Sequence, residues 1–470
     1  MSTLNINSNL SWADMEEDFS PISSRPSTPK VENISVTGTG TLETGSIPDN
    51  NLEINKFGNL LCYTFTECDE NSPLVQQLYR GIIKNENGEV ICQSFGYTPE
   101  FSHTDDENLT KFVEPVLKSS KCYVSYEGSI IRLFYNKTSD NTNTCWQLST
   151  HRKIDSFNSR WGSSKSYGEL FVNSLVERDA TLLEGNTKDD NGNFVYEKVI
   201  EEYTIKNKLD KNYNYIFMIT TSNENRIVCE NENNQVFFVG AFNSNNVVKR
   251  TDTFSELGYL PIFEYISPDK ITNTGFETPT LVDIKDMNEL KEYVSNVDYK
   301  KSQGLIFITN EGRTVKVLNN KYYYYSKLRG NNPNILLRYL ELQYEKDKQR
   351  VKEFVELYDD KRELFIEFGK VLDDICGNIY RKYRNRFVRK MVSIAPPEQY
   401  YVIRELHDHF LRDKVNNIVT PQRVAMYVFE MSPERIYGLY HMYTKRRNET
   451  GNGNKLQEEF KTKVKDFIYQ

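Results

Sequence analysis

The chain has 470 residues, of which 27% are charged and 38% are hydrophobic, and its formal net charge is -7. This length suits two or three domains that each bury their own core. No run of about 18 apolar residues is present, which excludes a membrane-spanning helix, and the N-terminus lacks the basic and apolar blocks of a secretory signal. The seven cysteines form no C-x-x-C pair, so we expect neither a disulfide framework nor a metal site.

The first 55 residues form a polar segment with a net charge of -6. They are rich in Ser, Thr, Asn, Gly and Pro and cannot bury enough apolar surface to offset the entropy that ordering would cost. We therefore predict a disordered acidic tail over residues 1–55. Its Ser-Trp-Ala-Asp element begins a short acidic stretch that contains Trp12 and Phe19. These two rings are either a partner-binding anchor that folds on contact or stray aromatic residues in a tail.

Residues 56–330 show mostly the alternating and apolar runs of β-strands, separated by turn residues. Two hairpins are predicted, one turning at Asn87-Gly88 and one near Glu311-Gly312. The stretch 124–134 (VSYEGSIIRLF) also has the pattern of a strand, a tight turn and a second strand. Helical patterns interrupt the strands at residues 167–178 and 286–296. This mixture predicts an α+β domain built around antiparallel sheets.

Residues 331–470 change to a period of 3.6 and carry a net charge of +5. The apolar positions from Leu336 to Tyr358 predict one long helix, and those from Leu364 to Met391 predict a second. Later helices are predicted to begin at Thr420-Pro421 and at Ser432-Pro433, where a capping hydroxyl precedes a proline suited to the first helical position. The sequence therefore predicts an all-α C-terminal domain.

The densest basic segment of the chain is residues 378–390. Tyr380, Tyr383, Phe387 and Met391 recur at helical spacing and should face the core, which leaves the basic side chains outside. One interpretation is that the exposed side chains contact nucleic-acid phosphates, and the other is that they form a solvated helix face paired with nearby acids. The candidate phosphate contacts are Arg381, Arg384 and Arg386.

Short motifs occur along the β-rich region in a fixed order. They are Arg80-Gly81-Ile82, Tyr126-Glu127-Gly128-Ser129, Asn225-Arg226-Ile227-Val228, Gln303-Gly304-Leu305-Ile306 and Val315-Lys316-Val317-Leu318. In order and spacing they resemble the motifs of bacteriophage-type RNA ligases, members of the covalent nucleotidyltransferase superfamily. The resemblance covers residues 75–330 and implies a nucleotidyltransferase (ATP-grasp-like ligase) domain over residues 56–330, followed by a C-terminal helical domain over residues 331–470. The stretch 144–171 also resembles a block found in ligase-like proteins of giant DNA viruses, which implies a viral source.

The resemblance also allows the chemistry to be tested by position. In these ligases a lysine three residues before the motif I glycine attacks the α-phosphate of the nucleotide as an activated amine. Ser125 occupies this position, and a hydroxyl cannot form the phosphoramide intermediate. Further phosphate- and metal-binding positions of the family fall on uncharged or acidic residues, namely Met218 or Ile219, Gln303, Leu318 and Glu100. Covalent nucleotidyl transfer is therefore predicted to be absent, and no cofactor is expected.

One alternative keeps an active enzyme. The run Lys153-Ile154-Asp155-Ser156 has the spacing of lysine and aspartate in motif I, with serine in the place of glycine. If it is the true motif, Lys153 is the nucleophile of an ATP-dependent RNA ligase that uses ATP or GTP and Mg²⁺.

A pocket without its nucleophile can still bind a base, because stacking on aromatic side chains requires no reaction. We therefore predict a pseudoenzyme that binds an RNA 5′ end, the mRNA cap or a nucleotide non-covalently. A positively charged 7-methylguanine would gain further from ring quadrupoles, with Glu127 reading its edge. For each aromatic residue, packing in the core is the alternative. The predicted binding residues of this domain are Ser125, Tyr126, Glu127, Arg80, Arg132, Trp146, Trp161, Lys316 and Arg226.

The tail stretch SWADMEED is similar to a stretch in disordered arms of translation initiation factors that assist the cap-associated helicase. This similarity implies a viral translation-initiation factor whose tail recruits initiation proteins while the folded part holds RNA or a nucleotide. No membrane partner is predicted, and the expected location is the host cytoplasm or a viral factory. A protein scaffold in which the pocket is only vestigial is the remaining alternative.

Overall fold

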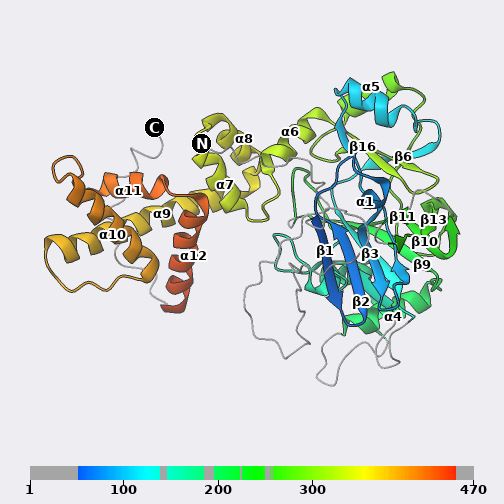
Figure 1. Ribbon diagram of the computed structural model, residues 1–470, viewed down its shortest axis with the longest axis horizontal. Helices are drawn as coiled ribbons and strands as arrows, with labels where there is room; N and C mark the ends of the chain where they lie inside the picture. The colour runs from blue at the N-terminus through cyan, green and yellow to red at the C-terminus, as the bar shows by residue number, and fades with distance from the viewer. Residues whose placement is uncertain are drawn as a thin grey trace. The chain divides into compact units, whose positions relative to one another are not determined.

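The computed structural model describes residues 51–137, 146–184, 195–222, 225–248, 254–255 and 258–450 (Figure 1). The chain divides into two compact units, the first ending at Lys327 and the second beginning at Leu328. Most of the predicted tail, with Trp12 and Phe19, lies outside the described residues. Its predicted end is wrong, because strand β1 (Leu52–Phe57) already begins at Leu52. Among the described helices, none has both the length and the apolar character that crossing a bilayer requires.

A four-stranded antiparallel sheet begins the first unit, with the strand order β1-β2-β3-β4. The elements that follow β1 are β2 (Leu60–Phe65), α1 (Leu74–Leu78), β3 (Arg80–Asn85) and β4 (Val90–Cys92). β3 and β4 pair across the turn at Asn87-Gly88, where Gly88 has a φ of 79°. The predicted hairpin is thereby confirmed, and a glycine suits this left-handed conformation.

Two five-stranded sheets form the rest of the first unit's framework. Sheet I has the order β13-β10-β9-β7-β8 and consists of β7 (Ser129–Tyr135), β8 (Trp146–Ser149), β9 (Tyr213–Thr220), β10 (Gln235–Val248) and β13 (Ile262–Ile266). Sheet II has the order β14-β6-β15-β16-β5 and consists of β5 (Glu100–Ser102), β6 (Ser120–Ser125), β14 (Leu281–Val282), β15 (Gly304–Thr309) and β16 (Thr314–Leu318). The β15–β16 hairpin turns around Glu311-Gly312, as predicted. A two-stranded ribbon joins β11 (Phe254–Ser255) to β12 (Gly258–Tyr259).

The stretch 124–134 contains the two predicted strands, but they do not pair with each other. β6 lies in sheet II and pairs with β15, whereas β7 lies in sheet I and pairs with β9. Residues 126–128 therefore cross from one sheet to the other. The crossing is tight at Gly128, where an added Cβ would lie 2.6 Å from the carbonyl oxygen of Ile219.

The alternation of side chains along β6 and β15 explains how the two sheets are placed. One face of sheet II, with Cys122 and Phe307, packs against the π-helical turn Leu109–Val113 and helix α5. The opposite face, with Tyr123 and Ile308, packs against sheet I. Because neighbouring residues of a strand point to opposite faces, a single strand supplies both cores. The helices on this side are α2 (Asp106–Asn108) and α5 (Met287–Asn296), the second of which matches a predicted helical patch.

The second face of sheet I is covered by helices α3 (Tyr167–Arg178) and α4 (Tyr196–Lys206). Phe171 of α3 contacts Phe217 of β9, with ring centroids 5.1 Å apart. Helix α3 begins with a capping box, in which Ser166 and Glu169 each satisfy the other's backbone N–H. The helical patch predicted over residues 167–178 is confirmed. The first unit is thus α+β, as the sequence predicted, and its sheets are antiparallel apart from the parallel pair of β16 and β5.

The second unit is entirely helical in its described part. Its elements are α7 (Ile335–Tyr344), α8 (Lys348–Leu357), α9 (Arg362–Tyr383) with a π-helical turn (Arg384–Val388), α10 (Pro397–Arg412), α11 (Pro421–Phe429) and α12 (Pro433–Thr450); helix α6 (Asn320–Arg329) leads into it. The first predicted helix is two helices, because the chain turns at Lys346, which has a φ of 59°. The predicted starts of α11 and α12 are confirmed. Met391 is exposed rather than in the core, because the helix ends before it reaches that position.

Candidate functional site

A cavity of about 80 Å³ lies between sheets I and II, and we call it the inter-sheet pocket. Its apolar walls include Tyr123 and Ile306 from sheet II and Ile130, Met218 and Val239 from sheet I. Its polar lining residues are Arg80, Thr98, Ser125, His151, Thr314 and Lys316. The pocket therefore combines apolar walls from both sheets with a few polar groups.

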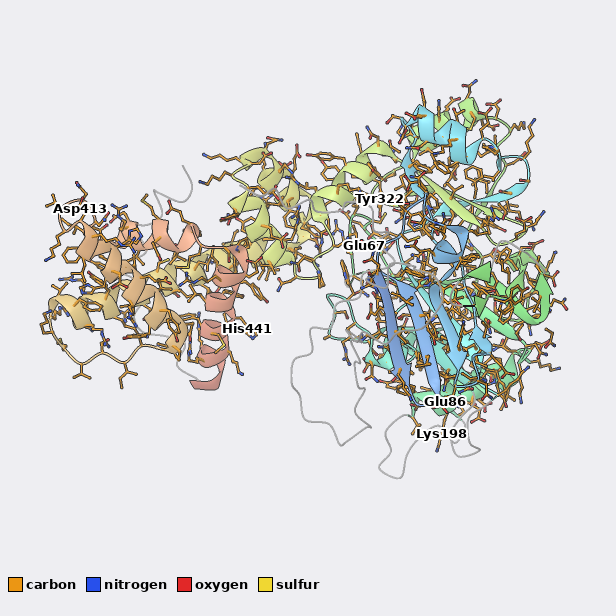
Figure 2. All side chains as sticks on the ribbon, viewed as in Figure 1. Glu67, Glu86, Lys198, Tyr322, Asp413 and His441 are labelled. Carbon is orange, nitrogen blue, oxygen red and sulfur yellow. The ribbon has the colours of Figure 1, made fainter. Side chains whose placement is uncertain are left out.

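Ser125 lines this pocket at the end of β6, and its hydroxyl is engaged by the protein. The Ser125 Oγ donates to Gln303 Oε1 at 2.8 Å, and Gln303 Nε2 donates to the Tyr322 hydroxyl at 2.7 Å. The Tyr322 hydroxyl in turn donates to Glu127 Oε2 at 3.0 Å. Figure 2 labels Tyr322 near the start of α6. Ser125, Gln303 and Tyr322 are therefore joined in a chain of hydrogen bonds that ends on the Glu127 carboxylate.

Glu127 has a structural role in this arrangement. Both of its carboxylate oxygens accept backbone hydrogen bonds, from Ile227 at 2.7 Å, Val228 at 2.8 Å and Cys229 at 3.1 Å. Burial raises the pKa of Glu127, and these backbone donors together with the Tyr322 hydroxyl lower it in part. The carboxylate holds the 227–229 segment against the sheet crossing, so its oxygens face protein donors rather than the pocket. Glu127 is also absent from the lining of the inter-sheet pocket.

Lys316, the lysine retained in motif V, forms an ion pair with Glu100. The distance from Nζ to Oε1 is 2.8 Å, and the two side chains are only 17% and 14% exposed. The pairing follows from the parallel register of β16 and β5, which places the two residues side by side. A neighbouring carboxylate offsets the lysine charge that would otherwise attract a phosphate. Lys316 and Glu100 together therefore carry no net charge.

A second, smaller cleft adjoins the pocket and shares Gly128, Ile130 and Lys316 with it. Three further predicted binding residues, Glu127, Trp161 and Arg226, line this cleft. The Arg226 guanidinium pairs with Glu230 at 2.9 Å. These three residues therefore lie beside the inter-sheet pocket without lining it.

The other predicted residues of this unit have different surroundings. Arg132 is fully buried and donates to the carbonyl oxygens of Gly81 and Thr150 and to the Ser149 hydroxyl, so it ties three segments together. Trp146 belongs to a ring cluster with Tyr135 and Tyr215. For these two residues the structure supplies internal partners, and neither lines the inter-sheet pocket.

Arg80 and Tyr126 do line the pocket. The Arg80 guanidinium donates to the Gly96 carbonyl oxygen at 3.0 Å. The Tyr126 ring stacks on Phe237 with the centroids 4.7 Å apart, and its hydroxyl lies 3.0 Å from that of Thr280. Both side chains are thus held in fixed positions at the pocket wall.

Lys153, the nucleophile of the alternative, lies in the turn that follows β8. The Thr150 N–H donates to the Lys153 carbonyl oxygen at 2.9 Å, and the Lys153 N–H donates to the Thr150 hydroxyl at 3.1 Å. Lys153 is not among the lining residues of the inter-sheet pocket, whereas Ser125 is.

The three predicted phosphate contacts of the second unit, Arg381, Arg384 and Arg386, are exposed on α9 and the π-helical turn. Arg384 lies over the Tyr380 ring and Arg386 over the Tyr400 ring, 5.9 and 5.1 Å from the centroids. They belong to a different unit from the pocket residues.

Two residues that line the inter-sheet pocket, His151 and Met218, were not predicted to do so from the sequence. His151 lines the pocket, and its Nδ1 lies 3.3 Å from the Arg80 carbonyl oxygen. Burial and then the charges of Arg80 and Arg132 hold its pKa well below the usual value, so the ring is neutral at physiological pH. Its position in the stretch 144–171 was the available signal. Among the described residues, no group of three or more His, Cys, Asp or Glu side chains is arranged to hold a metal ion.

The fold and the pocket define an α+β protein with antiparallel sheets and C-terminal helices. No protein-family model matches the chain. It is similar to the immediate-early protein ICP-46 homologs of two invertebrate iridescent viruses. The chain is 23% identical to the homolog of Invertebrate iridescent virus 3 over 391 residues, which cover 82% of this chain and 77% of the viral protein. It is 23% identical to the homolog of Invertebrate iridescent virus 6 over 368 residues, which cover 75% of this chain and 72% of the viral protein.

Solved structures of Naegleria gruberi RNA ligase are also similar to the chain. A lysine-to-methionine variant with AMP and Mn is 9% identical with a TM-score of 0.30, and the match covers 50% of this chain and 58% of the ligase. The same ligase with PPi gives 9% identity and a TM-score of 0.28, over 47% and 56%. The match spans less than two thirds of the ligase chain.

Proposed function

We propose that the first unit has a nucleotidyltransferase-like fold and binds a nucleobase non-covalently in the inter-sheet pocket. The base belongs to a nucleotide, an RNA 5′ end or an mRNA cap. The observation that carries this proposal is the position of Ser125, which lines the pocket where the ligase motif would place a nucleophilic amine. The Ser125 hydroxyl donates to Gln303 at 2.8 Å, and a neutral amide is not a general base that could activate it as a nucleophile.

The pocket walls favour a base over a phosphate. Ile130, Met218 and Ile306 offer apolar contact to both faces of a flat ring, and Met218 is unbranched and can shift to admit it. The charge of Lys316 is offset by Glu100. Ligand binding in a concave, mostly apolar site with a few polar groups is the general pattern for small molecules in proteins.

Binding is tested by titrating the full-length protein with adenosine, guanosine, 7-methylguanosine, ATP and a 5′-phosphorylated RNA in a calorimeter. Met218→Trp fills the pocket and should abolish the binding of whichever base is bound. Met442→Trp makes the same exchange at an exposed position of the second unit and should leave binding unchanged. Absence of heat with every probe, or equal loss in both variants, would contradict the proposal.

Loss of catalysis is tested separately by incubating the protein with radiolabelled ATP or GTP and a divalent metal, followed by denaturing electrophoresis. We expect no label on the protein. A covalent label that disappears in Lys153→Ala would establish the ligase alternative instead. A label that persists in that variant would also overturn the assignment of a non-covalent site.

We further propose that the N-terminal tail recruits translation-initiation proteins. The support for this role is the sequence of the stretch that contains Trp12 and Phe19. In an initiation assay on a capped reporter mRNA, the full-length protein should change translation and the Trp12→Ala, Phe19→Ala double variant should not. Equal activity of the two proteins would remove the tail from the proposed function.

A further inference from the structure

The second unit exposes a short apolar segment directly after its longest helix. Residues 388–394 comprise the last residue of the π-helical turn and the six residues that follow it. Four large aliphatic side chains of this segment are exposed, with Val388 at 60%, Met391 at 55%, Val392 at 98% and Ile394 at 89%. Side chains exposed to this extent protrude from the surface rather than line a groove.

The protruding segment is held by the structure around it. The Arg389 N–H donates to the Arg384 carbonyl oxygen and the Met391 N–H to the Asn385 carbonyl oxygen, each at 2.8 Å. At its base the Phe387 ring stacks on His407, with the centroids 3.6 Å apart. These contacts fix where the loop begins and how it leaves the helix.

The segment belongs to a strongly cationic stretch of the chain. Residues 378–396 contain six Lys and Arg residues and no Asp or Glu. Lys382 is half-buried and donates to Gln399, while the others are exposed. The exposed cations are Arg381, Arg384, Arg386, Arg389 and Lys390.

Exposed aliphatic residues beside clustered cations match the two components of an anionic lipid surface. Apolar side chains gain by entering the boundary between head groups and acyl chains, and Lys and Arg gain from the negative surface potential. RNA would engage the cations but offers little to bare aliphatic side chains, because bases stack on aromatic rings. The nearby rings of Tyr380 and Tyr400 are already covered by Arg384 and Arg386.

We infer that residues 388–394 dock this protein on an anionic membrane surface, with Val392 and Ile394 entering the lipid and the surrounding cations contacting head-group phosphates. The sequence predicted no membrane partner because it contains no membrane-spanning run. Surface docking does not need one, since a loop and a charged patch are enough.

The test is co-sedimentation of the full-length protein with vesicles. Vesicles of equal parts phosphatidylcholine and phosphatidylserine should bind the protein, and vesicles of phosphatidylcholine alone should not. The Val392→Ser, Ile394→Ser double variant should reduce the partition coefficient at least tenfold, and Arg386→Glu with Arg389→Glu should do the same. All four side chains are exposed, so folding is unaffected, which circular dichroism will check.

A matched control exists in the same unit. Val415 and Ile418, between α10 and α11, are also exposed, at 78% and 57%. The Val415→Ser, Ile418→Ser double variant also replaces two exposed aliphatic side chains by serine, and it should leave vesicle binding intact. Equal loss in the control, or wild-type binding by the Val392/Ile394 variant, would overturn the proposal. Failure of the protein to bind either kind of vesicle would also overturn the proposal. If that protein bound single-stranded RNA and the Arg386→Glu, Arg389→Glu variant did not, the cations would be a site for RNA.

Discussion

The two units place their charged and apolar side chains in opposite ways. Among the described residues, five of the six buried Lys, Arg, Asp and Glu side chains lie in the first unit. Thirteen of the twenty exposed large apolar side chains lie in the second. A buried charge persists only where the fold supplies partners, and exposed apolar side chains point to a partner outside the chain only where they form a contiguous patch. The first unit therefore satisfies its buried charges internally, whereas the second exposes more apolar side chains.

The largest effect is expected where the first unit buries a carboxylate. Glu127→Ala leaves three backbone N–H donors and the Tyr322 hydroxyl without their acceptor. We expect a loss of about 3–5 kcal/mol in the free energy of unfolding. Urea denaturation monitored by tryptophan fluorescence measures it. Glu127→Gln retains one acceptor oxygen and should lose less stability. A smaller loss for Glu127→Ala than for Glu127→Gln would show that the carboxylate does not hold the 227–229 segment.

The second prediction concerns the ion pair that offsets the charge of Lys316. Glu100→Gln keeps the shape of the side chain and removes its charge, so Lys316 becomes available to a phosphate. The affinity for ATP relative to adenosine should rise about tenfold, and the gain should shrink at high salt. Glu405→Gln, which removes a partly buried acid that pairs with Arg435 in the second unit, serves as control. An unchanged ratio of the two affinities would mean that the pair does not govern phosphate binding.

In the second unit, a smaller effect is expected at a helix cap. The Thr420 hydroxyl accepts the Arg423 N–H at 3.1 Å at the start of α11. Thr420→Ala should lower the free energy of unfolding by about 1 kcal/mol, while Thr420→Ser, which keeps the hydroxyl, should change it little. Thermal unfolding of the two variants checks this. Equal stabilities would indicate that α11 takes its stability from packing alone.

The smallest effect concerns Asp373 on α9, whose pKa is raised to about 6 by burial and then by the charge of Asp374. Because the folded state holds its proton more tightly than the unfolded chain, stability is lost as the pH rises from about 4 to 6. Asp373→Asn should therefore raise the Tm at pH 7 and leave it unchanged at pH 4. The carboxylate is only half-buried, so the rise is about 2 °C. Glu367→Gln, on an exposed position of the same helix, should give no such pH dependence.

Local patterns in the sequence predicted the elements well. The hairpin at Asn87-Gly88, helix α3 and the starts of α11 and α12 follow from turn glycines, apolar periodicity and capping residues, which act over a few positions. Periodicity failed where one backbone conformation interrupted it. Lys346 adopts a left-handed conformation that no residue pattern indicated, and one predicted helix became α7 and α8.

The site was less accessible to sequence reasoning because its contacts are long-range. Glu127 meets partners 100 and 195 positions away, at Ile227 and Tyr322. The stretch 124–134 gave the right strands, but not the sheet that each strand joins, because sheet membership depends on β9 and β15 rather than on the stretch itself. Motif spacing did bring Ser125, Gln303 and Lys316 to one region. It could not tell that each of these side chains would find an internal partner.

The crossing at residues 126–128 limits how the pocket can open. Between Ser125 and Ser129 the chain makes four Cα steps, which reach at most about 14 Å even when fully extended. The two sheets are therefore joined covalently at this end of the pocket, where β6 passes to β7. We expect any widening of the gap between the sheets to be smallest beside this crossing and to strain the hydrogen bonds that Glu127 accepts from residues 227–229.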